Sequence, residues 1–217
     1  GTVSVSVPRG GSPAVERSGE QAFGSWLADY VKSKYKTDLV LLNGGGIRDT
    51  FPATTYIPAD KNLRRPSTSA PAQGPWDVVL GDVYTVNPFG NNYATTTITG
   101  AKLWAALENG VSNFPTDGRF PQIGGFKFTA DVTKPKGERV VSVTLPNGTP
   151  IAKDDKVFTI TTLDFIGYGG DGYTQFDIAQ LRIRDRDAEV VAEALRADMS
   201  AGKATTMTVD GRITIIK

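Results

Sequence analysis

The sequence contains no histidine and no cysteine. Without histidine, the chain cannot assemble a Ser-His-Asp triad, use an imidazole as general base or hold a metal ion through imidazole nitrogen. Without cysteine, it has no thiol nucleophile, no disulfide and no thiolate zinc site. Within this chain, only a carboxylate metal site or a carboxylate acid–base pair remains possible.

Strong charge of either sign is also lacking. The 217 residues carry a net charge of +1, which gives no electrostatic reason to expect nucleic-acid affinity or an anionic membrane as partner. No apolar run approaches the length of a membrane-spanning helix. Hydrophobic residues make up 39% and charged residues 22% of the chain, so a packed core is expected. The chain begins with Gly1 instead of methionine, as expected of a processed or excised segment.

Apolar periodicity predicts helices and strands in a mixed order. Ser18 and Gln21 resemble a capping box for a helix over residues 19–36, and Thr99 is placed to cap a second helix. A third helix is expected over residues 186–199. Strands are expected at 2–7, 39–42, 93–98, 126–130, 140–145, 157–163 and 212–216. The run at 39–42 is unbroken and apolar, which predicts a strand buried on both faces.

Residues 52–75 contain five prolines and a Ser-Thr-Ser-Ala segment. We expect an exposed and mobile loop insertion there. Several predicted strands follow one another between residues 126 and 163, which indicates a central β-meander. No internal repeat and no interdomain linker is visible. The sequence therefore predicts a single α+β domain over residues 1–217.

Three glycine-rich loops stand out. They are Asn43-Gly-Gly-Gly-Ile-Arg48, Asn87-Pro-Phe-Gly-Asn91 and Asp164-Phe-Ile-Gly-Tyr-Gly-Gly-Asp-Gly-Tyr173. The first satisfies only half of G-x-G-x-x-G, because Asp49 occupies the third glycine position, and it lacks the Gly-Lys-Ser/Thr of a P-loop. The third loop does not have the acidic spacing of an EF-hand. None of these standard nucleotide or calcium motifs is therefore indicated.

Each loop also has a purely structural interpretation. Glycines commonly form a tight turn after a core strand, a loop phenylalanine often fills a core, and Asp171 between glycines can hold a turn. Together, however, the loops combine aromatic rings with directed polar groups. Two phenylalanines around a flat ring, an aspartate for hydroxyl groups and an arginine for negative charge would make a nucleoside or sugar site, by analogy with base stacking in single-strand binders.

Five stretches, in this order, resemble the C-terminal, substrate-binding domain of the 5′-nucleotidase/UDP-sugar hydrolase family. They cover nearly the whole chain: Arg17-Ser-Gly-Glu20 with Gly24 and Leu27-Ala-Asp29, Asn43–Arg48, Gly81–Asn91, Gly124-Gly-Phe126, and Phe165 with Gly169–Gly172. Each motif is weak alone, but five in order are specific. The chain departs from the family at Gly24-Ser25-Trp26, where Gly-Asn-Leu is usual, and at Asn87-Pro88-Phe89, where Leu-Pro-Phe is usual.

The resemblance implies roles for seven residues. Phe89 and Phe165 match the two phenylalanines that sandwich the nucleobase, and Asp171 matches the aspartate that holds the ribose hydroxyls. Asn43 matches the asparagine beside the base and sugar. The other three match two arginines that help to bind the ribose-phosphate part and a glycine whose backbone approaches the ligand: Arg17, Arg48 and Gly125.

The resemblance also implies what this chain does not contain. In the family, an N-terminal metallophosphoesterase domain binds two divalent metal ions through Asp, His and Asn residues and hydrolyses the phosphate ester. A chain without histidine cannot contain that site. We therefore expect this chain, without a cofactor of its own, to bind a nucleoside or nucleotide but not to hydrolyse it, and to act with an N-terminal metallophosphoesterase domain. An extracellular, periplasmic or cell-surface location is implied.

Two other functions remain open. The same fold could serve as a non-catalytic extracellular binding module that recognises carbohydrate or acts in adhesion. Alternatively, Asp171 and Asp164 could form the carboxylate pair of a glycoside hydrolase, which requires a defined separation between the two acids.

Overall fold

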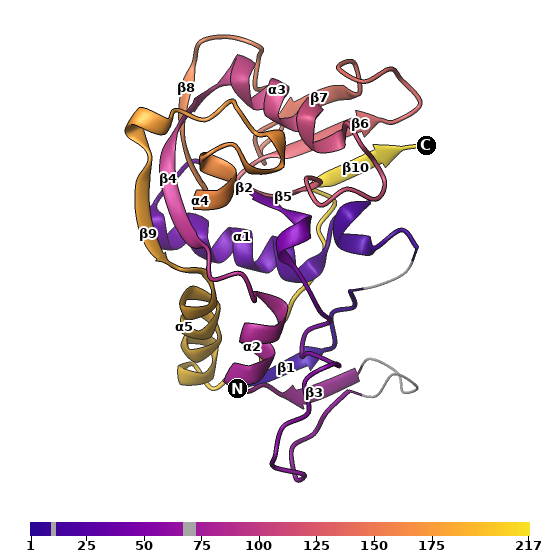
Figure 1. The fold of residues 1–217 in the computed structure, drawn as a ribbon, viewed down its shortest axis with the longest axis vertical. Helices are drawn as coiled ribbons and strands as arrows, with labels where there is room; N and C mark the ends of the chain where they lie inside the picture. Colours follow the sequence, from indigo (N-terminus) through magenta and orange to yellow (C-terminus); the bar gives the residue numbers. More distant parts are fainter. Residues whose placement is uncertain (10–11, 67–72) are drawn as a thin grey trace.

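A computed structural model describes residues 1–9, 12–66 and 73–217 and shows three β-sheets (Figure 1). The strands are β1 (Thr2–Val5), β2 (Leu39–Asn43), β3 (Gln73–Asp77), β4 (Asn92–Thr99), β5 (Pro121–Gly124), β6 (Lys127–Asp131), β7 (Val140–Thr144), β8 (Val157–Leu163), β9 (Arg182–Arg186) and β10 (Ile213–Ile216). The five-stranded sheet has the order β5-β2-β8-β4-β9, the three-stranded sheet has the order β10-β6-β7, and β1 pairs with β3.

The α-helices of the described residues are α1 (Ala22–Tyr35), α2 (Leu80–Val86), α3 (Gly100–Val111), α4 (Asp164–Gly167) and α5 (Asp187–Ser200). Short 3-10 helices are η1 (Val15–Arg17), η2 (Gly44–Gly46), η3 (Gly170–Gly172) and η4 (Ile178–Gln180). Figure 1 places α2, α5 and the β1–β3 pair at one end of the molecule, away from β6, β7 and β10. None of these helices is long and apolar enough to cross a membrane.

Strand β2 lies inside the five-stranded sheet, between β5 and β8. It runs parallel to β8 and antiparallel to β5, and all of its residues are buried. Helix α1 packs against β2 and β5, and α3 contacts β4, β5 and β7. The prediction of a strand covered on both faces is confirmed.

Helix α1 exists as predicted but begins later. Its N-cap is Gln21, whose side-chain oxygen accepts a hydrogen bond from the Gly24 amide at 2.8 Å. The Ser18 hydroxyl instead donates to the Ala14 carbonyl at 2.9 Å, because residues 15–17 already form η1. The predicted capping box, with Ser18 as its first residue, is therefore wrong.

The other predicted helices are confirmed. The Thr99 side chain accepts a hydrogen bond from the Lys102 amide at 3.2 Å and so caps α3. Helix α5 begins at Asp187, one residue after the predicted start. Strand β9 was not predicted, because its sequence Arg-Ile-Arg-Asp-Arg is exposed along its whole length and has no apolar face to signal a strand.

The predicted central β-meander is reduced to the β6–β7 hairpin. Strands β5 and β8, on either side of it in the sequence, belong to the five-stranded sheet, and β10 joins β6 from the C-terminus. Gly125 causes the change of sheet between β5 and β6. Its φ is +81°, and a Cβ at this position would collide with the Asp38 carbonyl oxygen. The mixed single-domain class is as predicted, but the connectivity of its strands is not.

The predicted loop insertion at 52–75 is anchored in the core at several points. Arg65 pairs with the buried Asp82 carboxylate, which also accepts hydrogen bonds from the amides of Ala53 at 3.0 Å and Val79 at 2.8 Å. Beyond it, β3 pairs with β1. Residues 67–72, toward the end of the expected insertion, lie outside the described residues.

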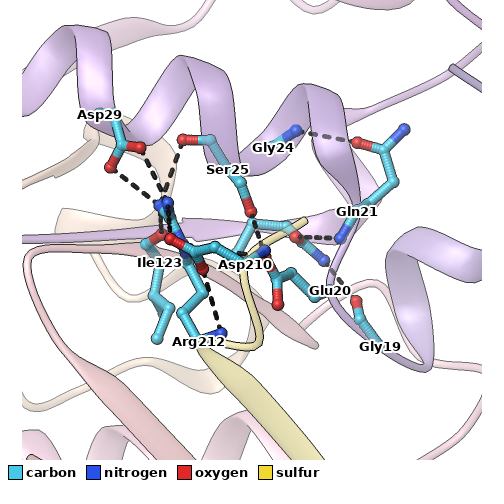
Figure 2. A network of polar contacts seen from close by, with 10 residues as sticks. Gly19, Glu20, Gln21, Gly24, Ser25, Asp29, Ile123, Asp210 and Arg212 are labelled. Atoms are coloured by element: carbon cyan, nitrogen blue, oxygen red, sulfur yellow. Dashed lines mark hydrogen bonds and ion pairs between the residues drawn. The ribbon is translucent and has the colours of Figure 1, made fainter. Parts of the chain in front are cut away.

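Arg212, just before β10, joins the C-terminal segment to α1 (Figure 2). Its guanidinium donates to both carboxylate oxygens of Asp29 at 2.8 Å and to those of Asp210 at 2.8 and 2.9 Å. It also donates to the carbonyls of Ser25 at 3.3 Å and Ile123 at 3.1 Å. The residue is only 8% exposed. These contacts hold α1, β5 and β10 in fixed positions relative to one another.

Candidate functional site

Four loops meet at one edge of the five-stranded sheet. Strands β2 and β8 are parallel neighbours, so their carboxyl ends lie at the same edge. Strand β5 runs antiparallel to β2, and β4 runs antiparallel to β8, so both begin at this edge. The loops after β2 and β8 and the loops before β4 and β5 therefore converge, although they are far apart in the sequence.

A pocket of about 450 Å³ lies where these loops converge. Small-molecule sites commonly have volumes of about 300–1,000 Å³. The pocket is lined by six of the seven residues predicted to bind ligand: Arg17, Asn43, Arg48, Phe89, Phe165 and Asp171. The rest of its lining consists of Gly45, Gly46, Asn91 and Gly118.

Phe89 and Phe165 are exposed apolar side chains at this pocket. They are 59% and 44% exposed, so neither fills the core, which was the structural alternative for loop phenylalanines. Phe89 lies between α2 and β4, and Phe165 lies in α4, directly after β8. The Arg48 guanidinium lies over the Phe89 ring, 5.5 Å from its centroid. Both rings are therefore available to a ligand at the pocket.

Asn43 and Asp171 contact each other across the pocket. The Asn43 side-chain amide donates to the Asp171 carboxylate, with 2.7 Å between Nδ2 and Oδ2. Asp171 has a left-handed backbone conformation with φ of 53°, and Asn109 donates to its carbonyl oxygen at 3.1 Å. Asn43 Oδ1 is buried and has no hydrogen-bond partner among the described residues. The Asn43 amide therefore fixes the orientation of the Asp171 carboxylate.

The triple glycine allows backbones to approach one another closely. A Cβ at Gly44 would collide with the Glu16 carbonyl oxygen, and one at Gly45 would lie 2.9 Å from the Gly118 Cα. The first loop is therefore packed against η1 and against the loop before β5. Both interpretations of these glycines hold in part, because they form a tight turn and also bring the backbone to the pocket.

Arginines outnumber acidic partners on one side of the pocket. Glu16 is fully buried, and its Oε1 lies 3.0 Å from Arg9 Nε and 3.7 Å from Arg17 Nε. Arg17 donates to the Thr116 carbonyl at 3.1 Å. Burial, together with the charges of Arg9 and Arg17, lowers the pKa of Arg48, and Glu16 opposes this effect. Surplus positive charge of this kind favours an anionic ligand.

Gly125 does not line the pocket. It lies in a separate cavity of about 250 Å³ beside Asp29, Lys32 and Arg212. The structure therefore does not bring Gly125 together with the other six residues that the sequence predicts to bind ligand. The glycine is needed there for the sharp turn between β5 and β6 described above.

Asp164 lies beside the pocket but is not part of its lining. Its Oδ2 accepts a hydrogen bond from Asn92 Nδ2 at 2.8 Å, and its Oδ1 accepts one from the Phe165 amide at 2.7 Å. Of the carboxylate pair considered for a glycoside hydrolase, only Asp171 lines the pocket. Within the described part of the chain, no three acidic side chains are grouped so as to hold a metal ion.

Four residues near the site were not singled out from the sequence. Asn91 lies within a quoted motif, and its amide side chain beside an exposed phenylalanine was an available signal. Gly118 lies in a loop with no recognisable pattern. Arg9 and Glu16 join the site only through ion pairs that the fold creates.

This α+β domain, with one polar-aromatic pocket at the strand ends, belongs to a known family. Residues 1–178 match the family described as 5′-nucleotidase, C-terminal domain, so the chain is a member of it. The chain is 32% identical over 207 residues to the trifunctional nucleotide phosphoesterase protein YfkN of Bacillus subtilis, covering 91% of this chain and 12% of that protein. It is 30% identical over 201 residues to the cell wall protein Lmo0130 of Listeria monocytogenes, and the match covers 89% of this chain and 23% of that protein. It is 28% identical over 185 residues to human 5′-nucleotidase, and the match covers 81% of this chain and 28% of the human protein.

Solved structures confirm the mixed single-domain fold. A 5′-nucleotidase precursor from Thermus thermophilus is 30% identical, with a TM-score of 0.78. The match covers 100% of this chain and 39% of the precursor chain. The NAD nucleotidase of Haemophilus influenzae is 21% identical, with a TM-score of 0.73, and shares the fold. The chain thus spans less than half the length of each of these relatives.

Proposed function

We propose that this domain binds the nucleoside part of a substrate for a 5′-nucleotidase-type phosphoesterase. The base stacks between Phe89 and Phe165, the Asp171 carboxylate accepts hydrogen bonds from the ribose hydroxyls, and Asn43 lies beside base and sugar. Arg17 and Arg48 bind the ribose-phosphate part. One observation carries the proposal: six residues that the family implies, from four separate segments of the chain, line a single pocket.

The charge of the pocket supports a phosphorylated ligand. Arg48 has a lowered pKa because it is partly buried and other arginines lie near it, so an added anion relieves repulsion as well as forming hydrogen bonds. The Asp171 carboxylate accepts a hydrogen bond from the Asn43 amide. The pocket therefore offers a carboxylate as well as positive charge, which suits a ligand that has both hydroxyls and a phosphate.

Hydrolysis belongs, in this proposal, to an N-terminal metallophosphoesterase domain with two divalent metal ions. Two metals polarise the phosphoryl group and supply hydroxide, which this histidine-free chain is not equipped to do. The purified chain therefore binds without turnover. Relatives named as a cell wall protein and as a snake venom 5′-nucleotidase support a site of action outside the cytoplasm.

Isothermal titration calorimetry with AMP, GMP, CMP and UMP tests the base sandwich. Phe89→Ala and Phe165→Ala should each weaken binding about tenfold or more, because stacking contributes roughly 1–3 kcal/mol per base. Tyr168→Ala is the matched control, since Tyr168 is 60% exposed and does not line the pocket. It should bind as the unmodified protein does.

Three results would count against the proposal. If both phenylalanine variants bind nucleotides as tightly as the unmodified protein does, the base sandwich is ruled out. Ribose 5-phosphate or an oligosaccharide that binds as tightly as every nucleotide would favour the carbohydrate module instead. Phosphate release by the purified chain with Mg²⁺, Mn²⁺ or Zn²⁺ would overturn the division of labour between the domains.

A further inference from the structure

The Asp164 carboxylate joins the two segments that carry the aromatic rings. Its Oδ1 accepts from the backbone amide of Phe165 itself, at 2.7 Å, and its Oδ2 accepts from Asn92 Nδ2, at 2.8 Å. Asn92 is three residues beyond Phe89 and is the first residue of β4. A single side chain thus connects the start of the Phe165 segment to the end of the Phe89 segment.

The register of the sheet places these two residues opposite each other. In the antiparallel β4–β8 ladder, Tyr93 is paired with Leu163. The next position outward from that pair brings Asn92 to Asp164, where the strands separate into the two loops. The hydrogen bond therefore closes the ladder at the point from which both aromatic segments leave the sheet.

The Phe89 segment is also held on its other side. The amide of Asp187, at the start of α5, donates to the Asn91 carbonyl at 3.0 Å. Gly90 has a φ of +66°, and a Cβ there would lie 3.3 Å from Arg186 Nη1. With its far side packed on β9 and α5, the segment meets the start of the Phe165 segment through the Asn92–Asp164 hydrogen bond.

We propose that Asn92 and Asp164 are positioning residues that set the gap between Phe89 and Phe165 to the thickness of a planar base. This inference rests on the proposed function. Carbon atoms attract most strongly at about 3.5 Å, so a base in contact with both rings needs about 7 Å between them. An added gap of about 0.5–1 Å on one side already loses a quarter to a half of that attraction, so a small change at the connection has a large effect on affinity.

Exchange of donor and acceptor tests the proposal. Asn92→Asp places two carboxylates against each other and should open the gap by repulsion. The double variant Asn92→Asp/Asp164→Asn re-forms the bond in reverse, because the new amide at position 164 can donate to the new carboxylate at position 92 and still accept from the Phe165 amide. Asn147→Asp is the control, since Asn147 Oδ1 accepts from the Thr149 amide at 3.0 Å in a turn outside the pocket.

The readouts are calorimetric affinity for AMP and the ¹H–¹⁵N signal of the Phe165 amide in ligand-free protein. Asn92→Asp should bind AMP about tenfold more weakly, and the double variant should recover to within about threefold of the unmodified protein. The Phe165 signal should move in the single variant, because the Asp164 carboxylate that binds this amide loses its Asn92 donor. If Asn92→Asp lost affinity for AMP through general destabilisation, the affinity would not recover in the double variant.

Two results would overturn the inference. One is AMP binding by Asn92→Asp equal to that of the unmodified protein. The other is a double variant no better than the single. Failure of the proposed function looks different, because the unmodified protein would then bind none of the four nucleotides. In that case the Phe165 signal alone tests the positioning role. An unmoved signal in Asn92→Asp would show that the Asn92–Asp164 bond does not hold the Phe165 segment.

Discussion

Arginine is used in two contrasting ways in this molecule. In the network of Figure 2, Arg212 is surrounded by the carboxylates of Asp29 and Asp210 at 2.8 Å, with Glu20 at 3.9 Å. At the pocket, by contrast, Arg9, Arg17 and Arg48 lie around Glu16 as their common acidic neighbour. The first region has more acidic groups than basic ones, and the second has the reverse.

The pKa values of the two regions move in opposite directions for this reason. Burial lowers the pKa of Arg212, but the carboxylates of Asp210 and Asp29 outweigh burial and raise it. Burial also lowers the pKa of Arg48, and there the neighbouring Arg9 and Arg17 lower it further. The Arg212 network is electrostatically complete within the chain. The pocket cluster is not, and an anionic ligand would complete it.

The strongest test of this contrast is Arg212→Met. The variant keeps much of the side-chain volume but removes the cation shared by the carboxylates of Asp29, Asp210 and Glu20. It also removes the guanidinium donor to the carbonyls of Ser25 and Ile123. We expect the free energy of unfolding to fall by about 2–4 kcal/mol. Affinity for AMP, measured on the folded protein, should be unchanged. Denaturation in urea measures the first quantity and calorimetry the second.

The control is Arg196→Met, at an exposed arginine of α5. It should change the free energy of unfolding by less than about 0.5 kcal/mol. If Arg212→Met is as stable as this control, the network of Figure 2 does not hold the C-terminal segment in place.

The pocket arginine should behave in the opposite manner. Arg48→Met should lower affinity for AMP by about 10- to 100-fold, because hydrogen bonds between charged groups contribute roughly 1.5–3 kcal/mol. Its free energy of unfolding should stay the same or rise slightly, since repulsion from Arg9 and Arg17 is removed. The loss should shrink at high salt, where exposed charges are screened.

Arg196→Met again serves as the control for removing one positive charge, and it should leave AMP affinity unchanged. A variant Arg48→Met that unfolds as easily as Arg212→Met would show that the pocket cluster is structural. The distinction between the two regions would then disappear.

The sequence was informative where local pattern alone decides the structure. Three local patterns specify an element without reference to distant residues: the unbroken apolar run of β2, the Thr99 cap and the alternation of β6. The Asn43–Arg48 and Phe89 segments could be tied to ligand binding because they match a family in order. Their convergence follows from strand direction, because antiparallel β4 begins at the edge where parallel β2 and β8 end.

Other features depend on contacts that no local pattern reveals. Ser18 fails as a cap because the chain before it already forms a 3-10 turn. Gly125 looked like a ligand glycine but serves the turn that moves the chain from one sheet to another. The Arg9–Glu16 pair and the Asn92–Asp164 bond join residues through packing and register, so spacing in the sequence does not signal their roles.

A buried acid extends the comparison to a third position and gives the smallest predicted effect. Asp187 is 2% exposed, and burial, with a contribution from the charge of Asp164, raises its pKa to about 6. The amide of Ala188 and the nearby Arg186 act against this rise. Like Arg48, Asp187 is a charged group with too few opposite partners. Its folded pKa lies above its ordinary value of 3.8, so the native state binds this proton more tightly than the unfolded state does.

The stability contributed by that proton is present below about pH 4 and is lost as pH rises through about 6. Asp187→Asn keeps the acceptor for the Ala188 amide but cannot ionise. It should therefore raise the free energy of unfolding at pH 7 by about 1–2 kcal/mol and leave it nearly unchanged at pH 4. Urea denaturation at both pH values measures the difference. If Asp187→Asn raises the free energy of unfolding equally at pH 4 and pH 7, packing, and not the buried charge, limits stability here. In that case the comparison would apply to the arginines alone.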